Sequence, residues 1–185
     1  MKFIILAHQR TGTRLLSTAL NSHPDISCLP EECVDIDIKK GASVRGKIVM
    51  YNQLHGKFED NFGLRIIHLL RDPRDTAISD ILNDRDKAEN ENHDAHYYKK
   101  EPIKYHNIEK GFLQYKTDII NRYMWEVQKA LPQSIPTIEV RYEELTKGKE
   151  VRRIPKKPAE RILHFLGVKY RTLTTDLFKS PNKIK

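Results

Sequence analysis

The segment Lys2–Leu16, which reads KFIILAHQRTGTRLL, decides the fold. Its first part, Lys2–Ala7, is a short continuous apolar run, typical of a buried strand in a parallel sheet. The polar turn Arg10–Thr13 follows and opens a helical pattern with Leu15 and Leu16 on one face. A strand that runs into a helix N-terminus leaves free backbone N–H groups and the positive end of the helix dipole at the turn. The segment therefore predicts an anion site.

A second segment, Ile66–Ser79, has the same organisation. The apolar run ends at Arg71, and a helix is predicted to begin with Asp72 as its N-cap and Pro73 in its first position. Each of the two segments joins an arginine to a hydroxyl residue. Two such sites in one small domain indicate a ligand that carries two separate phosphate-like groups.

Length and composition fit a single domain over residues 1–185. The formal net charge of +8 favours anionic partners, and nucleic acid, an anionic cofactor or an acidic surface all fit it. The two cysteines, Cys28 and Cys33, lack a second pair for a zinc site, so free thiols in a reducing, cytoplasmic compartment are expected. No stretch approaches the roughly 18 apolar residues that a membrane span needs.

Strand and helix patterns alternate along the rest of the chain. Strands are predicted at residues 2–7, 26–29, 47–51, 64–70 and 137–140, and helices at 13–22, from 73, 108–131, 142–145 and 158–167. Residues 83–107 are polar with almost no aliphatic side chains, so we interpret them as an exposed insertion or lid. Trp125 in the long helix is expected to pack in the core. The pattern predicts a three-layer α/β domain with a mostly parallel sheet flanked by helices.

The turn Arg10–Thr13 has the makeup of a phosphate loop. Gly12 permits close approach of the backbone to an oxyanion, Thr11 and Thr13 supply hydroxyls, and Arg10 supplies a forked cation. The turn is not a Walker A loop, because no glycine precedes Gly12 at the required spacing and no lysine follows it. A plainer reading explains the segment equally well: Gly12 ends the strand and Thr13 caps the helix.

Arg71 is the informative residue of the second segment. Asp72, Pro73 and Asp75 are fully explained as residues that start a helix. Helix-start chemistry does not explain Arg71, which places a long cation at the carboxyl edge of the sheet, where open α/β sheets bind ligands. Ser79 follows about two helical turns later.

Together, and in this order, the motifs resemble the sulfotransferase family that uses 3′-phosphoadenosine-5′-phosphosulfate (PAPS). Arg10–Thr13 resembles the family's 5′-phosphosulfate loop, and Arg71–Ser79 matches every fixed position of its 3′-phosphate motif, Arg-x-Pro-x-Asp-x-x-x-Ser. Further similarity lies at residues 21–24, 46–47, 141–145 and 165–168. The resemblance implies a P-loop-like fold and transfer of a sulfonate from PAPS to a hydroxyl, less often an amine. It also implies release of 3′-phosphoadenosine-5′-phosphate (PAP) and no need for a metal.

The resemblance also assigns the site residues. The residues that would hold PAPS are Arg10, Thr11, Gly12, Thr13, Arg14, Arg71 and Ser79. Branches of the family with a glutamate base place it shortly after the first helix, which corresponds here to Glu31, with Glu32 one residue away and His55 as a weaker candidate. Lys47, together with Arg10, would neutralise the leaving phosphate.

Several functions remain open at this point. The acceptor implied by the resemblance is a small molecule, a carbohydrate or a lipid, and nucleic acid is not the expected partner. One alternative is a P-loop phosphotransferase that uses ATP and Mg²⁺, which the missing Walker lysine disfavours. Another is a non-catalytic basic module that binds nucleic acid, which the net charge permits.

Overall fold

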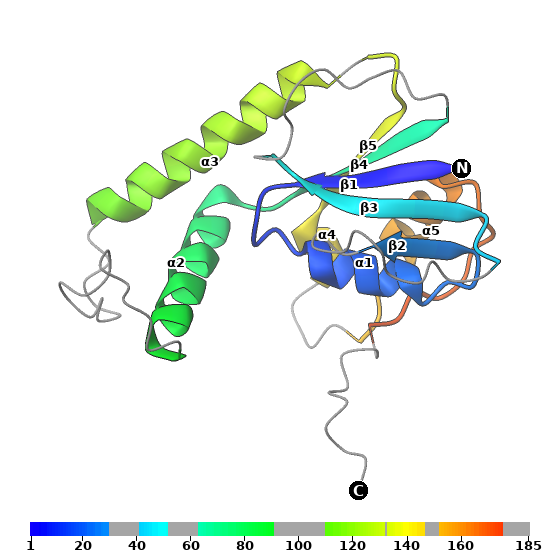
Figure 1. Cartoon of the computed structure of the whole chain (residues 1–185), viewed down its shortest axis with the longest axis horizontal. Helices are drawn as coiled ribbons and strands as arrows, with labels where there is room; N and C mark the ends of the chain where they lie inside the picture. The colour runs from blue at the N-terminus through cyan, green and yellow to red at the C-terminus, as the bar shows by residue number, and fades with distance from the viewer. Residues whose placement is uncertain (30–40, 52–62, 91–109, 132, 147–151, 176–185) are drawn as a thin grey trace, which may run out of the picture.

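The structure, a computed structural model, describes residues 1–29, 41–51, 63–90, 110–131, 133–146 and 152–175. It describes the side chains of these residues except at 83–90, 110–112 and 130. This part of the chain holds a five-stranded parallel sheet in the order β2-β3-β1-β4-β5 (Figure 1). The strands are β1 (Lys2–Ala7), β2 (Ile26–Leu29), β3 (Val44–Met50), β4 (Leu64–Leu70) and β5 (Thr137–Arg141).

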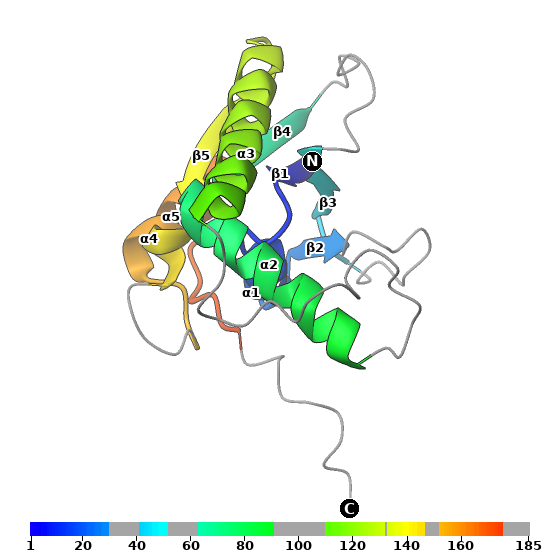
Figure 2. The ribbon, with the colours of Figure 1, turned by 90° about the vertical axis from the view of Figure 1, so that its left-hand side faces the viewer.

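Helices cover both faces of this sheet. They are α1 (Thr13–Asn21), α2 (Pro73–Asn90), α3 (Lys110–Ala130), α4 (Tyr142–Thr146) and α5 (Lys156–Phe165). Figures 1 and 2 show α3 along one face, with α1 and α5 on the opposite face. The predicted three-layer α/β architecture is confirmed. None of the helices that the structure describes combines the length and hydrophobicity of a transmembrane segment.

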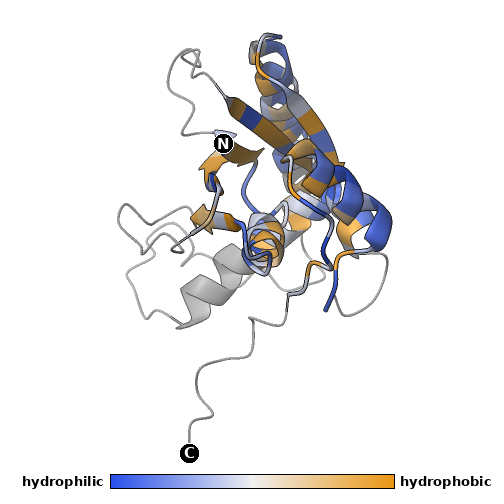
Figure 3. Cartoon of the chain, turned by 90° about the vertical axis from the view of Figure 1, so that its right-hand side faces the viewer, coloured by the Kyte–Doolittle hydropathy of each residue, from blue (hydrophilic) through white to orange (hydrophobic). Residues whose placement is uncertain are grey.

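The alternation of side chains along β1 explains why both faces are filled. Phe3, Ile5 and Ala7 belong to the larger core cluster, together with residues of α1 and α5. Ile4 and Leu6 belong to a second cluster, which includes Val127 of α3 and the partly buried residues around it. Because successive side chains point to opposite faces, a strand covered on both sides must be apolar throughout. Figure 3 shows hydrophobic residues concentrated along the strands.

The predicted strands at residues 2–7, 26–29 and 64–70 are confirmed residue for residue. β3 begins at Val44 rather than at residue 47, and α5 begins at Lys156 rather than at Pro158. Pro158 fits inside the first turn of α5 because the N–H that proline lacks has no intrahelical partner there.

The polar segment at residues 83–107 does not begin as a separate insertion. α2 continues through residues 83–90. That stretch contains neither glycine nor proline, so its polarity alone does not end the helix. The rest of the predicted insertion lies outside the described residues.

The prediction that Trp125 packs in the core is wrong, because its side chain is 57% exposed. Met124 and Val127 turn toward the sheet, and Trp125 lies about 100° around the helix from Met124. The indole packs instead against its own helix, with Lys129 Nζ 3.5 Å from the ring centroid.

Candidate active site

The two motif turns leave neighbouring strands at the same edge of the sheet. β1 and β4 pair in parallel, with Ala7 opposite Leu69, so Arg10 and Arg71 follow adjacent strand ends. From β1 the chain continues toward β2 and β3 on one side, and from β4 it continues toward β5 on the other. Ligands of open α/β sheets bind where the topology reverses in this way.

The first loop presents unused backbone donors. Gly12 is the N-cap of α1 with φ 93° and ψ 23°, and no side chain caps the helix. The first turn of α1 contains no acidic residue. The N–H groups at an α-helix N-terminus have no intrahelical partners, so this helix start is open to an anion.

Two residues shape this loop from within. Arg10 adopts a left-handed backbone conformation with φ 63°, which costs a non-glycine residue about 1–3 kcal/mol. The Thr11 side chain is 1% exposed, and its hydroxyl donates to the His8 carbonyl oxygen at 2.7 Å. The Thr11 proton is therefore used inside the loop. Thr13 is also buried, whereas Arg14 is exposed.

The start of α2 is confirmed as predicted. The Arg74 backbone N–H donates to Asp72 Oδ1 at 2.8 Å, so Asp72 caps the helix, and Pro73 is its first residue. The Thr76 hydroxyl donates to the Asp72 carbonyl oxygen at 2.9 Å. These bonds fix the direction in which the chain leaves β4, and with it the position of Arg71.

The structure brings the two predicted anion sites together. Arg10 Nε donates to Ser79 Oγ at 3.4 Å, and Arg71 Nη1 donates to the Arg10 carbonyl oxygen at 2.9 Å. An arginine from each motif thus donates a hydrogen bond to a residue of the other motif. The sequence motifs predicted two sites, and in the structure the two loops that carry them are in direct contact.

Tyr142 and Glu143, to which the sequence analysis gave no role, complete this junction. The Arg71 guanidinium carbon lies 4.5 Å from the Tyr142 ring centroid, and Glu143 Oε1 accepts the Asp72 backbone N–H at 3.0 Å. A Cβ at Gly12 would overlap the Tyr142 ring. Glycine is therefore required at position 12, both because φ is positive there and because the Tyr142 ring leaves no room for a Cβ. In the sequence, the only sign of a role for Tyr142 and Glu143 was the family similarity at residues 141–145.

The charges at the junction fit an anionic ligand. Arg71 Nε is buried and has no hydrogen-bond partner, and within the described residues neither Arg10 nor Arg71 forms an ion pair. Buried donors without partners cost free energy, so this pair of guanidinium groups suits a phosphate group that accepts several hydrogen bonds. Across the described residues no cluster of three His, Cys, Asp or Glu side chains could hold a metal ion.

A cavity of about 190 Å³ lies beside the first loop. Its lining residues are His8, Gln9, Met50, Tyr51 and Tyr123, which come from the ends of β1 and β3 and from α3. His8 and Gln9 directly precede the motif turn, and neither had a role predicted from the sequence. The other three lining residues could not be grouped from the sequence, since they are brought together only by the sheet order and by α3.

A row of polar groups crosses the sheet beneath this cavity. The Tyr51 hydroxyl and His68 Nε2 are 2.7 Å apart in a buried hydrogen bond, and His68 Nδ1 lies 3.9 Å from Glu139 Oε1. Burial lowers the pKa of His68, although the Glu139 charge opposes the shift, so the ring is neutral at pH 7. Burial and the Glu139 charge both raise the pKa of Tyr51, which stays protonated.

The remaining predicted residues are not part of this junction. Lys47 lies in the middle of β3, exposed and in register with Ile4, so the structure does not bring it to the loop edge. Glu31, Glu32 and His55 lie outside the described residues.

Comparison with known proteins identifies the family. The family model for the sulfotransferase domain matches residues 1–180. The comparison with curated proteins finds no match. A sulfotransferase from Alicyclobacillus acidocaldarius superposes with a TM-score of 0.58 at 16% identity, over 97% of this chain and 86% of that one.

Two further solved structures share the fold. The sulfotransferase domain from the curacin biosynthetic pathway has a TM-score of 0.56 at 14% identity, over 91% of this chain and 74% of that one. The mouse sulfotransferase SULT7A1, complexed with PAP, has a TM-score of 0.52 at 18% identity, over 92% of this chain and 59% of that one. The family match over nearly the whole chain shows that this protein belongs to the PAPS-dependent sulfotransferase family.

Proposed function

We propose that this protein transfers the sulfonate group of PAPS to a hydroxyl group of a small molecule, a carbohydrate or a lipid, with an amine as the second choice of acceptor group. One observation carries the proposal. The contacts of Arg10 with Ser79 and of Arg71 with the Arg10 carbonyl bring the two proposed anion sites together. A ligand with phosphate-like groups at both ends, such as PAPS, matches that arrangement.

Each end of the ligand has its own set of donors in this proposal. Arg71 and Ser79 hold the 3′-phosphate, because Arg71 Nε is buried and has no hydrogen-bond partner within the described residues. The free N–H groups at the start of α1 and the Arg10 guanidinium hold the 5′ end. Thr11 acts through loop shape, since its hydroxyl is used by His8. PAPS, when bound, supplies a sulfonate attached to a good leaving phosphate.

Gly12, Thr13 and Arg14 complete the proposed loop. Gly12 lets the backbone approach the anion, and Thr13 supplies the first helical N–H. Arg14, which is exposed in the first turn of α1, adds positive charge at this end. The chain thereby fixes the 5′ end of the ligand and stabilises the charge that develops there, which are the main contributions an enzyme makes to such an in-line displacement.

Glu31 is the proposed general base, on the resemblance of residues 23–32 to family members with a glutamate base. A carboxylate close to Arg10 would stay ionised at neutral pH, as removal of the acceptor proton requires. Lys47 remains a proposed aid to the leaving phosphate on the same resemblance, and its register with Ile4 adds no support.

An activity screen tests the proposal. The protein is incubated with PAPS and a panel of phenols, sugars and aliphatic alcohols, and PAP and sulfated products are measured by mass spectrometry. We expect PAP to form only together with a sulfated acceptor, without added metal. A parallel screen replaces PAPS with ATP and Mg²⁺. Phosphorylated products in the second screen and none in the first would contradict the proposal.

A further inference from the structure

The cavity beside the first loop has the size and lining of a binding site for one small ring. Its volume of about 190 Å³ is below the range of roughly 300–1,000 Å³ found for drug-sized ligands. Side chains of His8, Tyr51 and Tyr123 line it, so aromatic rings form much of its wall. His8 is two residues from Arg10, which places the cavity at the 5′ end of the proposed PAPS site.

The hydrogen bond of His8 determines its tautomer. His8 Nδ1 lies 2.9 Å from the Gln9 carbonyl oxygen. A carbonyl oxygen only accepts hydrogen bonds, so Nδ1 carries the proton and donates it. In the neutral ring Nε2 is then an acceptor, and among the described residues it has no hydrogen-bond partner. Nε2 therefore offers a lone pair to any donor bound beside it.

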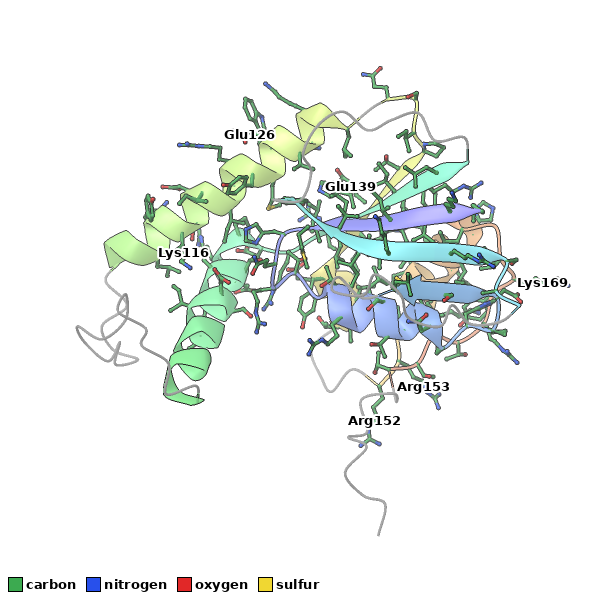
Figure 4. All side chains as sticks on the ribbon, viewed as in Figure 1. Lys116, Glu126, Glu139, Arg152, Arg153 and Lys169 are labelled. Atoms are coloured by element: carbon green, nitrogen blue, oxygen red, sulfur yellow. The ribbon has the colours of Figure 1, made fainter. Side chains whose placement is uncertain are left out.

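Neighbouring rings hold His8 in this orientation. The Tyr51 ring packs edge-on at 6.1 Å between centroids, and the Tyr123 ring lies at 6.3 Å. Tyr51 is itself fixed, because its hydroxyl is bonded to buried His68 at 2.7 Å. Figure 4 labels Glu139, which stands opposite His68 in the β4–β5 register on the side of the sheet that faces α3. The buried bond to His68 thus fixes the Tyr51 ring that packs against His8.

We propose that His8 is a specificity-determining residue, which recognises the acceptor by accepting a hydrogen bond from one of its hydroxyl or N–H groups at Nε2. The acceptor in this assignment is a small ring compound that carries such a donor. The assignment rests on the proposed sulfotransfer. It concerns how the acceptor is held and is separate from the removal of its proton by Glu31.

Binding of phenol and anisole tests this assignment, because the two probes share a ring and differ in the polar hydrogen. Their dissociation constants are measured by protein NMR titration, with and without PAP. We expect the protein to bind phenol about tenfold more tightly than anisole, the contribution of one net hydrogen bond. His8→Phe, which keeps a ring without Nε2, should bring the ratio close to one.

Two further variants separate recognition from structure. His8→Gln keeps an acceptor oxygen and should retain part of the preference. His164→Phe changes an exposed histidine on α5 and should leave the preference unchanged. Failure of both probes to bind, a ratio near one in the unmodified protein, or a preserved ratio in His8→Phe would each overturn the assignment.

The measurement without PAP distinguishes this proposal from the function on which it rests. If PAP fails to bind and the preference for phenol persists, the proposed function fails, and His8 is left as a residue that recognises a ring with a hydrogen-bond donor. If PAP binds and the preference for phenol is absent, the assignment of His8 fails and the proposed function stands. With an acceptor found in the activity screen, His8→Phe should raise the acceptor KM about tenfold at a similar kcat. A lower kcat at unchanged KM would instead show that His8 takes the proton, and recognition by His8 would be overturned.

Discussion

The anion edge of the site and the cavity beside it are built in different ways. The anion edge consists of two contiguous segments, Arg10–Thr13 and Arg71–Ser79, in which each residue has a recognisable local task. The cavity is lined by residues from β1, β3 and α3 that are far apart in the sequence. A ligand group that many proteins bind can be read from short motifs, whereas an individual acceptor is recognised by a surface that exists only in the folded chain.

The two regions also differ in how their charges are balanced. Arg10 and Arg71 have no ion-pair partners within the described residues, and Arg71 Nε is buried without a hydrogen bond. Under the cavity, the Tyr51 hydroxyl and His68 Nε2 are already hydrogen-bonded to each other. We therefore expect an anion to complete the first region, whereas the second already contains a buried internal hydrogen bond. Substitutions should therefore affect ligand affinity in the first region and acceptor choice or stability in the second.

The largest effect is expected from Glu31→Gln, which removes the proposed base. The acceptor kcat should fall about 10²–10⁴-fold, the usual contribution of a positioned general base, while the PAP dissociation constant stays the same. Steady-state kinetics with a sulfated acceptor and calorimetry with PAP measure the two quantities. Glu32→Gln is the matched control and should change kcat little. An unchanged rate in Glu31→Gln would remove Glu31 from this role.

Arg71→Ala should weaken PAP binding about a hundredfold, since the 3′-phosphate loses charge-assisted hydrogen bonds from a guanidinium whose Nε is buried. Isothermal titration calorimetry gives the two dissociation constants. Arg122→Ala removes the same charge from an exposed position on α3 and should leave PAP affinity within about twofold. Equal losses in both variants would mean that overall charge, and not the junction, binds PAP.

Gly12→Ala should lower PAP affinity about tenfold and reduce the free energy of unfolding by about 1–3 kcal/mol, because the new Cβ meets a positive φ and the Tyr142 ring. Urea unfolding and calorimetry measure the two effects. Gly41→Ala is a close control, since Gly41 has φ 91° and nothing within 4 Å of the added Cβ. It should reproduce the strain without the loss of affinity. Full PAP affinity in Gly12→Ala would show that the loop accommodates a Cβ at this position without losing its ability to bind PAP.

The smallest effect is expected from His68→Asn on the pH dependence of stability. Burial lowers the pKa of His68 below its unfolded value of about 6.5, so the unfolded state binds the proton more tightly. Stability should be fully present above that value and fall as the pH drops below it, with Tyr51 and Glu139 facing the ring. Urea unfolding on either side of this pH should show a shallower fall in His68→Asn. An identical pH dependence in both proteins would argue that His68 is not buried as a neutral ring.

The sequence predicted the fold and the helix starts after the two motif turns well, because both depend on local rules. The continuous apolar run Lys2–Ala7 specified a central strand, and Asp72 with Pro73 specified a helix start at its observed residue. The position of Trp125 was predicted wrongly because neighbouring residues of a helix point in different directions. The spacing of apolar residues in α3 did not decide which of them face the sheet. Tyr142 was missed because its role depends on Gly12 and Arg71, which lie in other segments.

The cavity could not be predicted for the same reason. His8 and Tyr51 become neighbours only because β3 pairs with β1, and His68 reaches Tyr51 from the strand on the other side of β1. In the sequence these residues look like ordinary strand-end or strand residues. Non-local pairing of this kind leaves no periodic signal in a single chain.

The central claim is that the two loops form one site for a nucleotide with anionic groups at both ends. Calorimetric titration of the unmodified protein with PAP and with 5′-AMP, without metal, tests it most directly because the two ligands differ only in the 3′-phosphate. The junction of Arg71, Ser79 and Arg10 predicts that PAP binds about a hundredfold more tightly than 5′-AMP. Equal affinities for the two nucleotides would contradict the account.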